Sequence, residues 1–255
     1  MSPIGIGVPF LFRTIAESEA AGLVTENLLI HIDASNASSY PGSGTTWTDL
    51  EGNYNTTLVN GPTYSSDDGG AIVFDGTDDY GILGKGISEL SNVQAYTFQA
   101  WYNFADVASI QLPWAYQRGG LNKMMGSQYH HGTNRLSIYA SLTNANQNGY
   151  IDNVNLVADT WYNITWVFNG TGGTNAERAQ MYMNGVNQTL GFGAGGISTH
   201  TPTFQHYHEM YLGARHTGVG QRFNGKIGEV EIYTSSLTAE EVQQNYNATK
   251  GRYGH

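Results

Sequence analysis

Acidic side chains clustered in one short stretch are the first feature of this chain that could carry chemistry. The segment "FDGTDDY", residues 74–80, holds Asp75, Asp78 and Asp79 next to Gly76. Grouped carboxylates of this kind bind calcium, act as general acids and bases, or cap the backbone of a tight turn. The residues on either side favour one of these three uses.

Apolar side chains alternate before and after this segment, which predicts a β-hairpin over residues 71–83. Asp75, Gly76 and Thr77 supply what its turn requires, because an Asp side chain caps a turn without any metal. A calcium ion needs about six to eight oxygen ligands, so a second loop carrying Asp67 and Asp68 would have to contribute. We predict no cofactor here and leave a structural calcium ion as the open alternative.

Histidines form the second group of residues that could carry chemistry. They stand beside Tyr129 and around the segment "MYLGAR", as His130, His131, His200, His206, His208 and His216. A zinc site needs three or four ligands held at fixed spacing, and the spacing of these histidines matches no metal signature. Loop histidines next to tyrosines are more often surface residues, so we predict no metal ligands among them.

Composition narrows the classes of protein to consider. The chain has 255 residues, 40% of them hydrophobic, with 33 glycines and 17 tyrosines, a balance that favours one all-β domain. Its formal net charge of -10 leaves no source for counterion release, so binding to nucleic acid is not expected. No apolar run reaches the ~20 residues that span a bilayer, so no membrane insertion is expected. Without cysteine the chain forms no disulfide and has no thiol nucleophile.

Short β runs separated by Gly, Asn, Asp and Pro fill most of the sequence from Leu28 onward. Alternation of aromatic and polar residues predicts core strands over 95–104 and 160–170, and Asn-Gly at 184–185 predicts a hairpin within 179–189. The helical signal is confined to the end, where Thr238 and Glu241 form a capping box. Gly251 stands where a left-handed C-cap is expected. The pattern predicts an antiparallel two-sheet sandwich with one short C-terminal helix.

The N-terminal segment differs from the rest. It is apolar and contains glycine, but it lacks the basic start and the neutral cleavage region of a signal peptide. An ordered apolar terminus needs something to hold it, and two explanations are open: a strand packed on its own domain, or an arm docked into a neighbouring protein. We divide the chain into an extended anchoring arm, residues 1–27, and a sandwich, residues 28–255. The side chains predicted to anchor the arm are Ile4, Ile6, Val8, Phe10, Leu11 and Phe12.

The order of the motifs resembles a known family. The segments "IVFDGTDDY", "YTFQAWYNF", "WYNITWVFNG", "MYMNG", "MYLGAR" and "FNGKIGEVEIYTSSLTAEEVQQNYNATKGRYG" are similar to those of laminin-G-like, concanavalin A-like jelly-roll domains. The resemblance covers residues 28–252 and is strongest to the versions found in structural proteins of tailed phages. It implies two antiparallel sheets, one of them concave, used for recognition of glycans or proteins.

The same family includes laminarinase-type glycoside hydrolases, so an enzyme is an alternative. Those enzymes place acidic residues at alternate positions of one strand, one as nucleophile and one as acid. Here "EVEIYT" aligns Glu229 and Glu231, but Tyr233 and Thr234 stand where the last carboxylate should be. The set is incomplete, and we expect no enzymatic activity.

Glycan recognition would use exposed aromatic rings with polar side chains beside them. Residues of this kind near predicted strand ends or loops are Trp114, Tyr116, Tyr129, His131, Tyr207 and Arg215. Packing in the core is the competing explanation for most of them.

We therefore expect a non-enzymatic surface protein of a phage virion, either a capsid decoration protein or a tail or fibre component. Residues 1–27 would bind other virion proteins, and the sandwich, as a homo-oligomer, would face host-surface glycans. The alternative is a free or cell-surface, extracellular lectin, and a hydrolase using Glu229 and Glu231 is the third choice.

Overall fold

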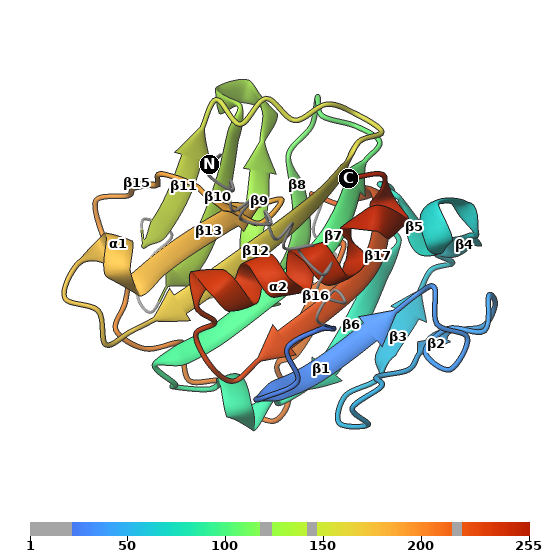
Figure 1. Cartoon of the computed structure of the whole chain (residues 1–255), viewed down its shortest axis with the longest axis horizontal. Helices are drawn as coiled ribbons and strands as arrows, with labels where there is room; N and C mark the ends of the chain where they lie inside the picture. Colours follow the sequence, from blue (N-terminus) through green and yellow to red (C-terminus); the bar gives the residue numbers. More distant parts are fainter. Residues whose placement is uncertain (1–21, 118–123, 142–146, 216–220) are drawn as a thin grey trace, which may run out of the picture.

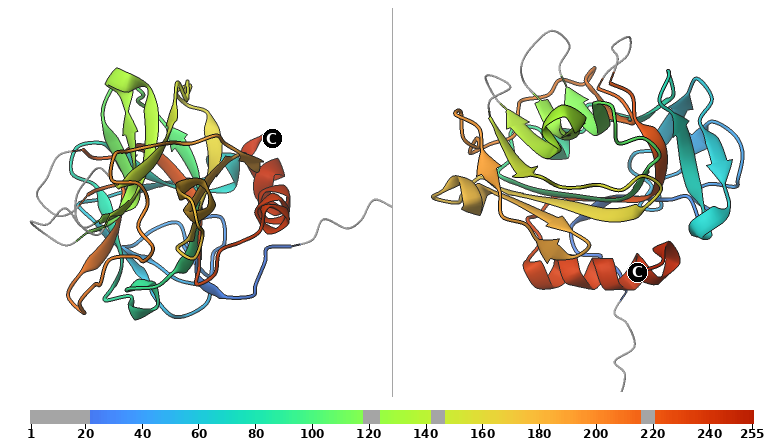
Figure 2. Two further views of the ribbon diagram at one scale, coloured as in Figure 1. Left: turned by 90° about the vertical axis from the view of Figure 1, so that its left-hand side faces the viewer. Right: turned by 90° about the horizontal axis from the view of Figure 1, so that it is seen from above.

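Two antiparallel sheets packed face to face form the fold, and a helix covers the outer face of one of them (Figures 1 and 2). The computed structural model describes residues 22–117, 124–141, 147–215 and 221–255. Within these ranges it confirms the predicted two-sheet sandwich with a C-terminal helix. The six apolar residues of the predicted arm, from Ile4 to Phe12, lie outside the described residues.

The first sheet has eight strands in the described part of the chain. Its order is β14-β13-β12-β7-β17-β5-β4, and β1 pairs with β17 beside β5. The strands are β1 (Leu28–Asp33), β4 (Thr63–Ser65), β5 (Ala71–Asp75), β7 (Ala95–Phe104), β12 (Trp161–Asn169), β13 (Ala179–Met183), β14 (Val186–Asn187) and β17 (Asn224–Tyr233).

The second sheet has nine strands in these same ranges, in the order β15-β11-β10-β9-β8-β16-β6-β3-β2. They are β2 (Thr46–Trp47), β3 (Thr56–Val59), β6 (Tyr80–Lys85), β8 (Gln111–Gln117), β9 (Met124–His130), β10 (Arg135–Ser141), β11 (Asn148–Asp152), β15 (Gly191–Phe192) and β16 (Glu209–Leu212). The α-helices are α1 (Asn175–Arg178) and α2 (Ala239–Thr249). Short 3-10 helices are η1 (Asp67–Gly69), η2 (Ser88–Leu90), η3 (His131–Thr133) and η4 (Lys250–Tyr253). No helix in the described ranges is long and apolar enough to span a bilayer.

Aromatic side chains fill the space between the sheets. Phe98 of β7 stacks on Trp114 of β8 with ring centroids 4.1 Å apart, which joins the two sheets at the centre of the core. Even-numbered residues of β7 face inward, as the alternation predicted. Its odd-numbered residues from Thr97 to Asn103 are buried as well, because α2 and the C-terminal residues cover the other face of this sheet (Figure 1). Aromatic burial on this scale is a main source of stability.

The turn at residues 75–79 has a different role from the one predicted. β5 and β6 do not pair: β5 lies between β17 and β4 in the first sheet, and β6 lies between β16 and β3 in the second. The predicted hairpin over residues 71–83 is therefore wrong, and the turn carries the chain from one sheet to the other. The Asp and Gly residues encode a reversal of direction, and that reversal is the same whether or not the two strands pair.

Helix α2 begins as the sequence predicted. Thr238 accepts a hydrogen bond from the backbone of Glu241, whose carboxylate accepts one from the backbone of Thr238. The left-handed cap lies three residues later than predicted, because the helix continues into η4. The residue with the positive φ, 80°, is Gly254, not Gly251.

Residues 22–27 of the predicted arm are attached to the sandwich. The backbone N–H of Val24 donates to Asn245 Oδ1 of α2 at 2.8 Å, and Tyr233 Oη donates to the Val24 carbonyl at 3.0 Å. Gln244 Nε2 also donates to the Gly22 carbonyl at 2.8 Å. The chain thus enters the described fold beside α2.

Candidate functional site

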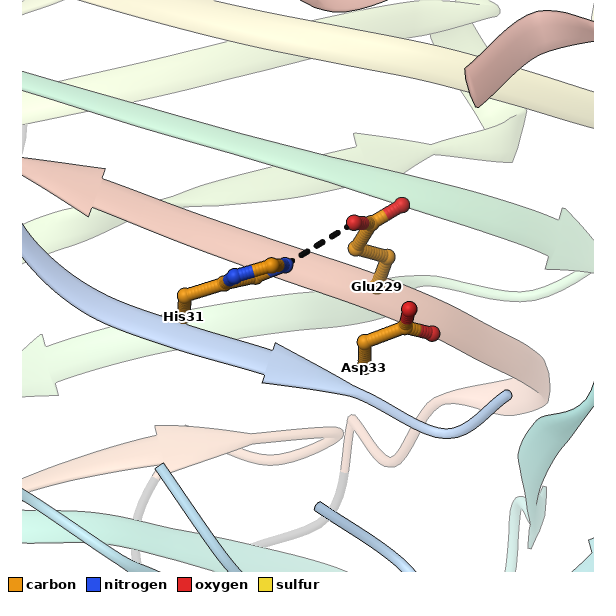
Figure 3. Close-up of side chains that lie close together, drawn as sticks. All are labelled: His31, Asp33 and Glu229. Carbon is orange, nitrogen blue, oxygen red and sulfur yellow. Dashed lines mark hydrogen bonds and ion pairs between the residues drawn. The ribbon is translucent and has the colours of Figure 1, made fainter. Parts of the chain in front are cut away.

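A buried ionic cluster joins the first strand, the last strand and the C-terminal segment. His31 and Asp33 lie on β1, Glu229 lies on β17, and their side chains converge (Figure 3). His31 Nε2 lies 2.9 Å from Glu229 Oε1. Arg252 of η4 completes the cluster by donating to Asp33 Oδ2 at 2.8 Å and to Glu229 Oε2. Only 2% of the Glu229 side chain and 11% of the Asp33 side chain are exposed, so the carboxylates are almost fully removed from water.

This geometry favours a fastening role over a metal site. Ligand atoms of His31, Asp33 and Glu229 lie within 4.8 Å of one another, a spacing that a metal ion could bridge. The Arg252 guanidinium, however, already binds both carboxylates, and a metal ion would have to displace it. Burial opposes the charge of Arg252, but Glu229 and Asp33 more than offset that effect and raise its pKa. The cluster holds the C-terminal segment against β1 and β17.

Aromatic stacking next to the ionic cluster reinforces this attachment. The Tyr253 ring stacks on Trp101 of β7 with centroids 4.2 Å apart and lies 4.7 Å from Trp161 of β12. Trp101 Nε1 also donates to Thr249 Oγ1 at 2.8 Å. The last turn of the chain thus covers the outer face of the eight-stranded sheet.

Glu231 lies on the same covered face and is fully buried. It stands opposite Gln99 on one side and His31 on the other, and neither carboxyl oxygen has a hydrogen-bond partner within the described ranges. Burial raises the pKa of Glu231 well above its usual range, and the charges of Glu229 and Asp33 raise it further. Burial thus favours the protonated form of the Glu231 carboxyl.

Two carboxyls on one face of a strand, one of them with a raised pKa, resemble the acid pair of a retaining glycosidase. The positions of the two residues do not match that use. Both side chains lie on the face covered by α2 and the C-terminal segment, where their residues are 0% and 2% exposed. A polysaccharide has no contact surface there, so this pair gives no support to the hydrolase alternative.

The aspartates of the 75–79 turn serve its backbone. Asp75 Oδ1 accepts from Thr77 N at 2.7 Å, which lowers the pKa of Asp75, and Asp79 Oδ2 accepts from Asp75 N at 3.1 Å. The neighbouring loop contributes a donor, because Asn60 Nδ2 binds the Asp78 carbonyl at 2.9 Å. These hydrogen bonds explain the aspartates as caps of the turn. Their carboxylate oxygens lie within 4.8 Å of one another, a spacing that a metal ion could also bridge.

The six residues expected to bind glycans do not come together. Trp114, Tyr116 and Tyr129 are 0–3% exposed and form part of the core, where Tyr116 stacks on Phe204 at 3.6 Å. A sugar cannot reach these rings, so they are corrected to core residues. His131 and Tyr207 are exposed but lie on separate loops. The sixth, Arg215, lines a surface hollow.

That hollow lies on the outer face of the nine-stranded sheet, on the side away from α2. It has a volume of about 90 Å³, and its lining combines two apolar residues with four polar ones. The lining residues are Leu112, Met124, Gln128, Tyr139, Arg215 and Gln221. Of these six, only Arg215 is among the residues predicted from the sequence to bind glycans.

One contact gives the lining of the hollow a defined shape. Tyr139 Oη donates to Gln128 Oε1 at 2.9 Å, a buried bond that fixes both side chains across β9 and β10. Gln221 Oε1 is buried without a hydrogen-bond partner in the described part of the chain. Elsewhere on this sheet, the Arg135 guanidinium of β10 lies 3.6 Å above the Tyr150 ring of β11. The period-two alternation of "MMGSQYH" and "RLSIYAS" was the signal that could have placed Gln128 and Tyr139 on one face.

The two sheets, their strand order and the covering helix define an antiparallel jelly-roll sandwich. A family model for the concanavalin A-like lectin/glucanases superfamily matches residues 75–243, and the chain belongs to this superfamily. Among curated proteins, no sequence matches the chain significantly.

Solved structures of similar fold include domains of carbohydrate-active enzymes. Domain 4 of a GH43 extracellular arabinanase from Geobacillus stearothermophilus, in complex with arabinotriose, is 17% identical with a TM-score of 0.62 and covers 89% of this chain and 100% of its own. Trypanosoma rangeli sialidase is 12% identical with a TM-score of 0.64, covering 91% of this chain but only 34% of its own. The botulinum neurotoxin serotype D binding domain is 10% identical with a TM-score of 0.60, covering 86% and 51%. At these identities the likeness concerns the fold.

Proposed function

We propose that this chain is a non-enzymatic carbohydrate-binding domain whose glycan contacts lie in the hollow on the outer face of the nine-stranded sheet. The observation that carries the proposal is the lining of that hollow. Arg215 and Gln221 are partly exposed there, and the buried Tyr139–Gln128 pair holds polar atoms in fixed positions. Fixed polar groups of this kind bind sugar hydroxyls, and Met124, 7% exposed, adds a small apolar contact.

Two further observations support a binding role. The arabinanase domain of the same fold was solved with arabinotriose, which makes that trisaccharide a rational first probe. In addition, burial of Glu229 and Glu231 beneath α2 leaves this acid pair out of reach of substrate. We therefore propose binding without turnover.

Substituting Gln128 by alanine is expected to weaken glycan binding about tenfold, because it removes a hydrogen-bonding group and releases Tyr139. Arg215→Ala is expected to act in the same direction. Titration calorimetry with arabinotriose and a panel of host-surface glycans measures the effect. Gln243→Ala on α2 is the matched control, since Gln243 lies on the opposite side of the sandwich. Unchanged affinity in the Gln128 and Arg215 variants would place the binding site elsewhere.

We further propose that the segment before residue 22 anchors the domain to a virion as a capsid, tail or fibre component, with the sandwich displayed on the surface as a homo-oligomer. The apolar sequence between Ile4 and Phe12 and the likeness to phage structural proteins motivate this proposal. The path of the chain supports it, because Gly22 is held by Gln244 of α2. The described chain thus begins beside α2, whereas the hollow lies on the outer face of the other sheet, and outward display requires such opposite placement of anchor and binding site.

Deleting residues 1–21 is expected to leave a folded sandwich that no longer joins its particle. The deletion has to stop there, since Val24 is bonded to Asn245 and Tyr233. The melting temperature of the truncated protein shows whether the sandwich is folded. Co-sedimentation with particles shows whether it still attaches to them. Undiminished incorporation of the truncated protein into particles would rule out this anchor.

A further inference from the structure

A second groove lies at the edge of the sandwich, where the two sheets end side by side. Strand β14 ends the eight-stranded sheet and β15 ends the nine-stranded sheet, and residues 188–190 connect them. The space between has a volume of about 260 Å³, close to the lower limit of known small-ligand sites. All of its lining residues belong to the described chain.

Carboxamides, one hydroxyl and apolar side chains line this groove, and none of the lining residues is ionisable. The residues that matter are Gln180, Asn187, Gln188, Thr189, Leu190 and Phe192. Leu190 and Phe192 are half-buried and pack against the main core, which makes a firm apolar floor. The absence of charge among these residues favours a neutral ligand, since a charged one would find no counter-charge.

Two of the carboxamides are already oriented by the protein. Tyr182 Oη donates to Gln180 Oε1 at 3.2 Å, which leaves the Gln180 Nε2 amide to donate outward. Gln188 Nε2 donates to the Val186 carbonyl at 2.9 Å, which leaves Gln188 Oε1 to accept. The groove thus presents one fixed donor and one fixed acceptor. Adjacent hydroxyls of a sugar ring, each able to donate and accept, can satisfy such a pair.

The charged residues next in sequence to the lining residues Ala176 and Ala179 are committed to the fold. Arg178 Nε of α1 donates to the Gly172 carbonyl at 2.8 Å, and Glu177 forms the capping box of α1 with Thr174. A peptide strand is disfavoured as the ligand because β14 and β15 are two residues long, too short an edge for backbone pairing. What remains is a compact neutral ligand with many hydroxyls and an apolar face.

We propose that this groove is a second carbohydrate site, selective for an uncharged saccharide unit that stacks on Phe192 and bonds to Gln180 and Gln188. This groove is separate from the hollow of the nine-stranded sheet, and binding in the groove does not require binding in the hollow. If both sites bind one polysaccharide, the second contact becomes intramolecular and raises the avidity without any additional surface.

Side-chain carboxamide signals in NMR spectra of the nitrogen-labelled full chain test the proposal. Arabinotriose, cellotriose and maltotriose at millimolar concentration are the probes, with a neutral tripeptide as the comparison. At least one trisaccharide is expected to shift the signals of Gln180, Asn187 and Gln188 saturably, while the tripeptide leaves them unchanged. Phe192→Leu, which keeps the apolar floor but removes the ring, is expected to weaken that binding about fivefold or more, and Phe192→Tyr to retain it.

Gln128→Ala separates this site from the other one, because it should leave the groove signals and their saturation unchanged. Loss of the groove shifts in Gln128→Ala would overturn the claim of an independent site. The proposal is also overturned if no trisaccharide shifts the three carboxamides, or if the tripeptide shifts them equally. Retained affinity in Phe192→Leu would contradict the stacking contact on which the proposal depends.

Discussion

Replacing Arg252 by methionine is expected to lower the free energy of unfolding by about 3 kcal/mol at neutral pH. The change leaves the Asp33 and Glu229 carboxylates, 11% and 2% exposed, without the guanidinium that binds both of them. Methionine keeps the apolar stem that lies against Gly69, so the loss reports the charge. We place the effect at the low end of the range for broken buried pairs because 24% of the Arg252 side chain is exposed.

Urea denaturation of a second variant distinguishes this electrostatic role from simple packing. Arg252→Lys keeps a positive charge near the two carboxylates and is expected to lose about half as much stability as Arg252→Met. Lys250→Met is the matched control: Lys250 Nζ binds the exposed Asn247 side chain at 2.8 Å and lies 5.4 Å from the Tyr246 ring, and its loss should cost less than about 0.5 kcal/mol. Equal destabilisation by Arg252→Lys and Arg252→Met would show that charge is not the cause.

Local signals in the sequence predicted the elements that depend on local physics. The alternation over 95–104 gave β7 with its inner and outer faces, because side chains alternate wherever a strand is extended. The capping box gave the start of α2, because its two hydrogen bonds join residues three positions apart. Asn184-Gly185 gave the β13–β14 turn, where both residues have positive φ.

Features that depend on contacts distant in sequence were not predicted. The turn after Asp75 has the same composition whether β5 pairs with β6 or crosses to the other sheet, and only the whole strand order decides this. Strand β8 is apolar on both faces, so its sequence does not show that Trp114 and Tyr116 point inward while Ala115 points outward.

The candidate sites were hidden for the same reason. The Tyr139–Gln128 pair exists only because β9 and β10 pair in one register, which no single segment encodes. Alternation placed Glu229 and Glu231 on one face, as the sequence predicted. It did not show that α2, which follows them in the chain, folds back over that face and removes them from solvent.

Glu231→Gln is expected to stabilise the protein at alkaline and neutral pH, unlike most substitutions of buried residues. The Glu231 carboxyl is fully buried, and its oxygens have no hydrogen-bond partner in the described ranges. Its pKa in the folded state is raised well above the ordinary value of 4.5, first by burial and then by Glu229 and Asp33. In the unfolded chain the same group ionises in water near its ordinary pKa.

The sign of the pH dependence follows from this difference. A carboxyl whose pKa is raised in the folded state keeps its proton up to a higher pH there than in the unfolded state. Its contribution to folding stability is therefore fully present below pH 4.5 and is lost as pH rises toward the folded-state pKa. Glutamine does not titrate. The stability gained by Glu231→Gln should therefore be near zero at pH 4 and grow to the order of 2 kcal/mol at pH 8.

Thermal melts of both proteins across this pH range measure the effect, and Glu240→Gln, an exposed position on α2, is the control that should show no trend. If the variant is destabilised equally at pH 4 and pH 8, the Glu231 carboxyl donates a structural hydrogen bond, and its desolvation does not limit the stability of the protein. If the trend appears, ionisation of the buried Glu231 carboxyl destabilises the contact between α2 and the sheet. Because Gly22 and Val24 are bonded to that helix, alkaline pH should then loosen the attachment of the N-terminal segment before it unfolds the sandwich.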